Sequence, residues 1–133
     1  MAHYLTLADV VALHAEVMER LGQGANPLRD EGALASAISR PRMAAHYEDA
    51  DVVRQAALLA VGISQAQAFL DGNKRTAFAA LFLFLSGNGS GFVGDSVQLG
   101  RQLEIVAERG GDRAAAEDAF EAWLRARVQP TSG

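Results

Sequence analysis

Apolar residues recur every three or four positions along most of the chain, which is the spacing of one face of an α-helix. In the first such stretch, Thr6 and Asp9 form a capping-box pattern. This pattern predicts a helix over residues 7–21 that ends at Gly22. Its apolar stripe consists of Val10, Leu13, Val17 and Leu21.

The same periodicity predicts five further helices. Asp30 and Asp112 stand where side chains cap helix starts, while the pair Arg40–Pro41 and the pair Gly110–Gly111 are expected to end helices. The expected helices cover residues 30–40, 51–68 and 74–86, a stretch from Val97 to Gly110, and a last stretch from Asp112 through Leu124.

The segment Pro41–Asp49 shows no clear period and is long for a connection within a compact domain. It is interpreted as an irregular loop or a small hairpin, with either an ordinary surface role or a functional one. No stretch shows sustained apolar–polar alternation. The predicted fold class is therefore all-α, a helical bundle of about six helices with room for one small hairpin.

Composition narrows the class of protein. The 133 residues suit one domain, expected over 1–128 with a frayed tail at 129–133. A net charge of −4 argues against direct nucleic-acid or anionic-membrane binding, and the lack of cysteine excludes disulfides. The apolar run 77–85 is too short to span a bilayer and the first residues do not resemble a signal peptide, so we expect a soluble, cytoplasmic protein.

Charges on the outer helices, such as Glu121 and Arg125, are expected to form solvated faces.

A small polar segment interrupts the two most apolar parts of the chain. Between Arg54 and Asp95 the charged residues are Asp71, Lys74 and Arg75 alone. Because both flanking segments should be buried, we expect these charges at the centre of the fold, where each needs a partner.

This segment has the chemistry of an anion site. It opens a helix, whose first N–H groups lack intrahelical partners, and Gly72 lets the backbone approach a ligand. Lys74 and Arg75 oppose the helix dipole there, which makes sense if they bind phosphate. Asp71 is then placed to hold Mg²⁺. The alternative is that Asp71 caps the helix while Lys74 and Arg75 extend to solvent.

Histidine offers little further catalytic chemistry by sequence alone. His3, His14 and His46 are all distant along the chain from the polar segment. His14 lies beside the apolar stripe of the first predicted helix, and we interpret it as a structural histidine.

The polar segment resembles the signature of the Doc (death-on-curing) branch of the Fic family, His-x-Phe-x-[Asp/Asn]-[Gly/Ala]-Asn-Lys-Arg. The resemblance extends to residues 28–34, 37–41, 83–85 and 122–124, and covers roughly residues 5–125. The matching signature residues are Phe69, Asp71, Gly72, Asn73, Lys74 and Arg75.

The resemblance implies an all-α Fic fold that uses ATP and Mg²⁺. Typical Fic proteins transfer AMP to a protein hydroxyl and have Gly where this chain has Lys74. The Lys form implies transfer of the γ-phosphate of ATP to a translation factor, which arrests growth, and pairing with a small antitoxin. By position, Asp71 would hold Mg²⁺, while the backbone around Gly72 and Asn73, together with Lys74 and Arg75, would bind the phosphates. Residues 41–49 would correspond to the flap that aligns a target peptide.

One position departs from the signature. Gln67 stands where the family has its His, the general base that takes the proton of the target hydroxyl. An amide is not basic enough for that role, and the loss of a general base lowers rates by about 10²–10⁴. His46 is a candidate substitute. Gln67 could be a disabling substitution, the mark of a natural inactive relative that only binds, or part of an active enzyme with altered chemistry.

Overall fold

The predicted all-α class is confirmed. The computed structural model describes residues 2–24, 27–108 and 112–131, and over these residues it contains six helices and one small sheet. The helices are α1 (Leu7–Arg20), α2 (Glu31–Glu48), α3 (Val52–Ala66), α4 (Asn73–Gly87), α5 (Ser96–Glu108) and α6 (Arg113–Arg125). The strands are β1 (Ser90–Phe92) and β2 (Val128–Pro130).

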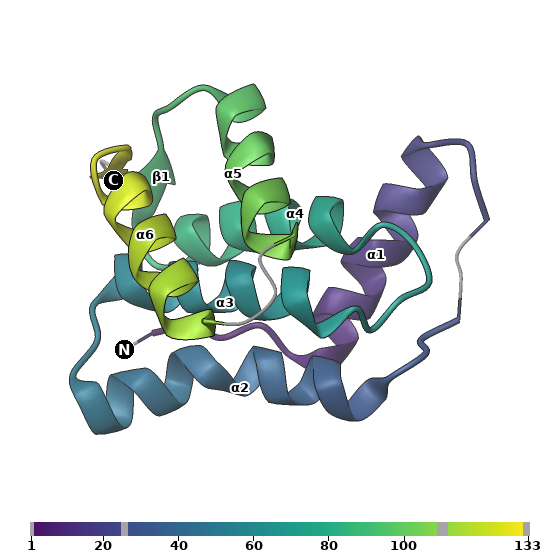
Figure 1. The fold of residues 1–133 in the computed structure, drawn as a ribbon, viewed down its shortest axis with the longest axis horizontal. Coiled ribbons are helices and arrows are strands. Elements are labelled where there is room, and N and C mark those ends of the chain that lie inside the picture. Colours follow the sequence, from purple (N-terminus) through teal and green to yellow (C-terminus); the bar gives the residue numbers. More distant parts are fainter. Residues whose placement is uncertain (1, 25–26, 109–111, 132–133) are drawn as a thin grey trace.

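Helix α3 forms the centre of the molecule, as its apolar sequence predicts. Every residue from Gln55 to Ser64 is buried, and α3 contacts α2, α4, α5 and α6. Figure 1 shows α3 and α4 side by side in the middle, with α2 running along one edge. Close approach of α2 and α3 depends on small side chains, since a Cβ on Gly62 would lie 3.2 Å from that of Ala37.

The predicted helix starts are confirmed by their caps. The Thr6 hydroxyl accepts from the Asp9 N–H at 3.1 Å, and the Asp9 carboxylate accepts from the Thr6 N–H at 2.8 Å. Asp30 and Asp112 each accept from a backbone N–H three residues on, both at 3.0 Å. The predicted stop at Gly110–Gly111 lies outside the described residues.

The predicted end of the second helix at Pro41 is wrong, and so is the loop or small hairpin expected over residues 41–49. Helix α2 continues through a buried Pro41 to Glu48, so residues 41–48 form neither a loop nor a hairpin. An internal proline loses one hydrogen bond and costs about 3 kcal/mol in a free helix. Packing against α3 offsets this, because the added turns bury Ala44.

The small sheet forms elsewhere, and it involves the segment that was expected to fray. Gly91 pairs with Gln129 and Phe92 with Val128 in antiparallel register. The Thr131 N–H then donates to the Gly89 carbonyl at 2.9 Å. A frayed tail from residue 129 is therefore wrong for residues 129–131, while Ser132 and Gly133 lie outside the described residues.

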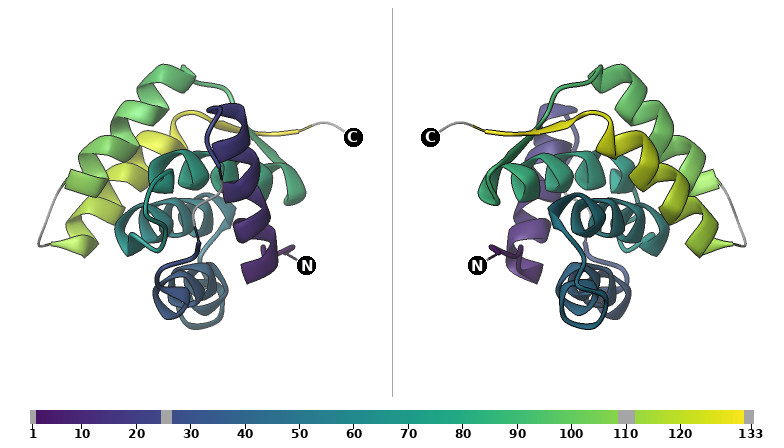
Figure 2. Two further views of the ribbon diagram at one scale, coloured as in Figure 1. Left: turned by 90° about the vertical axis from the view of Figure 1, so that its right-hand side faces the viewer. Right: turned by 90° about the vertical axis from the view of Figure 1, so that its left-hand side faces the viewer.

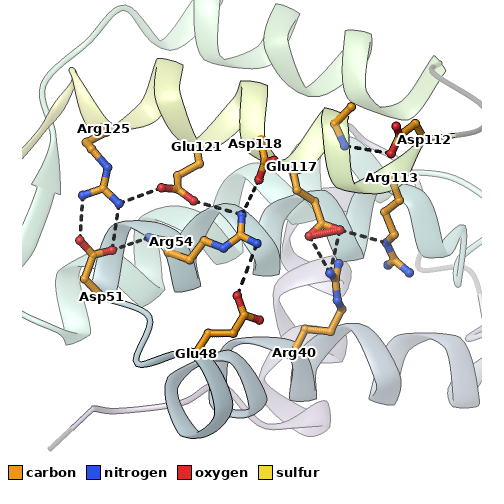
Figure 3. Close-up of polar contacts among 11 residues, drawn as sticks. Arg40, Glu48, Asp51, Arg54, Asp112, Arg113, Glu117, Asp118, Glu121 and Arg125 are labelled. Atoms are coloured by element: carbon orange, nitrogen blue, oxygen red, sulfur yellow. Dashed lines mark hydrogen bonds and ion pairs between the residues drawn. The ribbon is translucent and has the colours of Figure 1, made fainter.

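Charges on the outer helices do more than face solvent, which corrects that expectation. Figure 3 shows carboxylates of α6 meeting arginines of α2 and α3. Arg40 donates to both oxygens of Glu117, at 2.7 and 2.6 Å, and the Glu117 side chain is only 5% exposed. The expected Glu121–Arg125 pair is present at 2.9 Å, and Arg125 also binds Asp51 at 2.7 Å. These contacts fasten α6 to α2 and α3.

No helix in the described part of the chain is long and apolar enough to cross a bilayer.

Candidate functional site

The polar segment forms the turn between α3 and α4, and only part of it is buried. Phe69 is 1% exposed and Asn73 is 7% exposed, whereas Asp71, Lys74 and Arg75 are exposed. The expectation that these charges lie buried at the centre of the fold is therefore wrong. A turn between two antiparallel helices emerges at the end of the pair, however well the middles of the helices are covered.

The exposed residues of this turn line a cleft of about 810 Å³. Figure 2 shows that the end of α1 and the start of α5 rise on the same side of α4, and Figure 1 shows them apart along its length; residues of both contribute walls. The cleft lining from the turn and α4 includes Gln67 and Leu70 through Arg75; α1 adds Val17, Arg20 and Leu21, and α5 adds Ser96, Val97, Gly100, Leu103 and Glu104.

The start of α4 is suited to bind an anion. Gly72 is the N-cap residue, adopts a left-handed conformation with φ 81°, and provides no side-chain cap. The first N–H groups of the helix therefore receive no capping side chain, and they open next to the side chains of Lys74 and Arg75. Within the described part of the chain neither cation is in an ion pair. These features suit an anion at the start of α4, and the anion site stays a prediction.

Asp71 does not cap the helix in the ordinary way, through a backbone group two or three residues later. Its carboxylate oxygen Oδ1 accepts from the N–H of the next residue, Gly72, at 2.8 Å. The side chain remains exposed in the cleft. A single carboxylate beside two cations and an uncapped helix start is chemically suited to Mg²⁺ when phosphate is bound too, because Mg²⁺ is commonly held by one or two carboxylates together with phosphate oxygens and water. The described residues contain no cluster of three or more metal-binding side chains.

The turn is held in shape by Asn73. Its side-chain amide donates to the Phe69 carbonyl at 2.8 Å, and its carbonyl oxygen accepts from the Phe69 N–H at 3.1 Å. Asn73 was predicted to bind phosphate through its backbone, and its side chain is directed to the backbone of the turn. Only its backbone N–H is left for a ligand.

A second support comes from the chain just before α2. Leu28 forms an isolated antiparallel bridge with Phe69, and the Arg29 N–H donates to the Ala68 carbonyl at 2.7 Å. The Arg29 guanidinium donates to the Gln67 carbonyl at 2.8 Å. No local pattern in the sequence indicates this role for Arg29, because Gln67 lies 38 positions away.

Gln67 lies at the edge of the cleft in a left-handed conformation, with φ 49° and ψ 40°. Its side-chain amide donates to the Ser64 carbonyl at 2.9 Å, so it satisfies a free carbonyl in the last turn of α3. The side chain is thus engaged in holding the helix end. His46, the candidate substitute base, lies on α2 and is not among the cleft-lining residues.

His14 is brought to the turn by the fold, although it is distant in sequence. It is 1% exposed, its Nε2 lies 2.8 Å from the Asp71 carbonyl oxygen, and its ring stacks on Phe69 at 3.7 Å between centroids. The interpretation of a buried, hydrogen-bonded histidine is confirmed. Folding brings it into contact with the polar turn, a possibility that the sequence left open for His14 and His46.

Comparisons with known proteins support the family resemblance that the sequence shows. The Fic/DOC family model matches residues 4–85, which include the whole turn. The chain is also similar to the Toxin Doc of Mycolicibacterium smegmatis, with 35% identity over 91 residues that make up 67% of each protein.

Proposed function

The chain belongs to the Fic/Doc family, and we propose that it is a Doc-like toxin whose cleft binds ATP with Mg²⁺ and serves phosphoryl transfer to a protein hydroxyl. The observation that carries this proposal is the uncapped start of α4, which opens into the cleft beside Asp71, Lys74 and Arg75. A cognate antitoxin, a target in the translation machinery and action in the cytoplasm complete the proposal, by analogy with the family.

In this proposal each residue of the turn has a separate task. The N–H groups of Asn73 and Lys74 and the Lys74 ammonium bind phosphate oxygens, and the Arg75 guanidinium can bind two of them at once. Asp71 holds Mg²⁺, which when bound neutralises charge on the phosphates. Gly72 allows the backbone to come close, since its left-handed φ is open to glycine without strain.

Proton transfer is the weak part of the site. The target hydroxyl must lose its proton as its oxygen forms a bond to the γ-phosphorus and the bond from that phosphorus to the leaving ADP breaks. Gln67 has no basic atom for this proton, and its amide is engaged with Ser64. We therefore propose that this chain binds the nucleotide but transfers phosphate poorly.

The test is to measure label transfer from ATP to proteins of a bacterial translation extract, with this chain and with Gln67→His. The rate of label transfer by the His variant should be about 10²–10⁴-fold higher than that of the original chain. Gln67→Asn is the matched control, because it supplies an equally non-basic amide and should stay slow. Equal activity of the original chain and the His variant would contradict the assignment of position 67.

The position of the label separates the two enzyme classes. Label from the γ-phosphate on the target indicates a kinase, and label from the α-phosphate indicates AMP transfer. A binding protein without catalysis is the second candidate, favoured by the engagement of Gln67 with Ser64. It predicts that Gln67→His neither transfers label nor arrests growth.

A further inference from the structure

We propose that His14 is a positioning residue: from α1 it fixes the orientation of the peptide unit that joins Asp71 to Gly72. Through this peptide it sets the direction of the Asp71 carboxylate in the cleft. The proposal goes beyond a structural role in the core, and its binding test rests on the proposed function.

The hydrogen bond of His14 has a defined direction. A backbone carbonyl can only accept, so the 2.8 Å contact between Nε2 and the Asp71 oxygen requires a hydrogen on Nε2. The ring has little freedom to turn away, because it is 1% exposed and lies nearly parallel to the Phe69 ring, at an interplanar angle of 6°. Phe69 is in turn held by Asn73.

The direction of the carbonyl determines the direction of the next N–H. In a trans peptide the C=O and N–H bonds point to opposite sides. Because the Asp71 carbonyl is directed to His14 on α1, the Gly72 N–H is directed away from α1. There it donates to the Asp71 carboxylate at 2.8 Å. His14 thus acts on the carboxylate through one rigid peptide unit.

Contact between α1 and Gly72 makes this arrangement stiff. A Cβ on Gly72 would lie 3.4 Å from the His14 ring and 2.8 Å from the Met18 sulfur. The turn therefore rests directly on one face of α1, while Val17 of the same helix and the C-cap residue Leu21 line the cleft. A change at His14 therefore alters the peptide that carries the Asp71 carboxylate without removing Asp71, Lys74 or Arg75 from the site.

Two variants separate the donor from the ring. His14→Phe keeps an aromatic ring against Phe69 but has no donor, whereas His14→Gln keeps an N–H donor of similar reach but has no ring. Val10→Ala is the matched control, because Val10 is a buried residue of the same helix and is expected to lower Tm without touching the turn. Circular dichroism and thermal melting check that each variant folds.

The probe is Mg²⁺ with a non-hydrolysable ATP analogue, measured by calorimetry. We expect His14→Phe to bind about 10–100-fold more weakly, as for other residues that orient metal-binding groups, and His14→Gln and Val10→Ala to bind within a few-fold of the original chain. Binding by folded His14→Phe as tight as that of the original chain would overturn the proposal. So would equal losses in all three variants.

A second measurement needs no variant and no nucleotide. Heteronuclear NMR of the unmodified chain should show hydrogen on Nε2 of His14 and a hydrogen-bonded Gly72 amide. An Nε2 without hydrogen would overturn the proposal even if no variant folds. Failure of the analogue to bind the original chain would instead count against the proposed function, and the NMR result would still decide the role of His14.

Discussion

Asn73 binds both backbone groups of Phe69 through one side chain, with its amide nitrogen on the carbonyl and its amide oxygen on the N–H. This pair closes the turn that carries Asp71. Both partners are buried, so neither backbone group of Phe69 can turn to water instead.

We expect Asn73→Ala to lower the free energy of unfolding by about 2–4 kcal/mol, because it leaves two buried backbone groups without partners. Urea denaturation measures this loss. Asn88→Ala is the control, since the Asn88 amide also binds backbone carbonyls but at a more exposed place, and it should cost about 0.5–1.5 kcal/mol. Equal losses in the two variants would show that the Phe69 contacts contribute little.

Gly72→Ala should be more harmful than Gly22→Ala. Both glycines have positive φ, 81° and 72°, so both variants carry a backbone strain of about 1–2 kcal/mol. At Gly22 the added methyl group meets nothing within 4 Å, whereas at Gly72 it lies 2.8 Å from the Met18 sulfur. Thermal denaturation should show a further loss of about 1–3 kcal/mol for Gly72→Ala. The same Tm for both variants would mean that Met18 moves aside freely.

Glu117 should be sensitive to replacement on its own but not together with Arg40. Glu117→Ala leaves the Arg40 charge partly buried without its carboxylate, which should cost about 2–4 kcal/mol in urea denaturation. In Arg40→Met/Glu117→Leu both charges are gone, and most of the loss should be recovered. If the double variant is less stable than Glu117→Ala, apolar side chains do not pack well at this contact between α2 and α6.

Acid should weaken the contact between Asp51 and Arg125. The hydrogen bonds from the Arg125 guanidinium lower the pKa of the Asp51 carboxyl below its ordinary value of 3.8. Because its pKa is lower in the folded state, the ionised Asp51 carboxylate stabilises the folded protein above pH 3.8. This stabilisation is lost as the pH falls through the folded-state pKa.

The variant that tests this is Arg125→Gln, which leaves the Asp51 cap on Arg54 in place. The original chain should be more stable than the variant near neutral pH, and the difference should shrink as the pH falls below 3.8. The effect will be small and salt-dependent because both side chains are about half exposed. A difference that stays constant down to low pH would contradict the assignment. Arg20→Gln, which removes an exposed pair on α1, should show little difference at any pH.

Local signals in the sequence predicted well what depends on near neighbours. The caps at Thr6, Asp30 and Asp112 each involve residues three positions apart, and the burial of α3 follows from its own composition. The uncapped start of α4 likewise follows from Gly72 and the residues after it, while anion binding there stays a prediction.

Features set by distant partners could not be predicted in the same way. Pro41 normally ends a helix, and only packing against α3 explains why α2 continues. Glu117 looks like any exposed acid until α2 brings Arg40 to it. Strands β1 and β2 have three residues each, too few to show an alternating pattern.

The contacts that shape the turn also set when it can form. His14 reaches Asp71 across 57 residues and Arg29 reaches Gln67 across 38, whereas α3 and α4 are neighbours in sequence. Closing longer segments of chain costs more entropy, and contacts between distant residues form slowly. We therefore expect the pair α3–α4 to assemble early and the turn to acquire its final shape only when α1 docks. A partly folded chain would then carry every residue of the site and still be unable to bind, so that newly made protein stays inert until folding is complete.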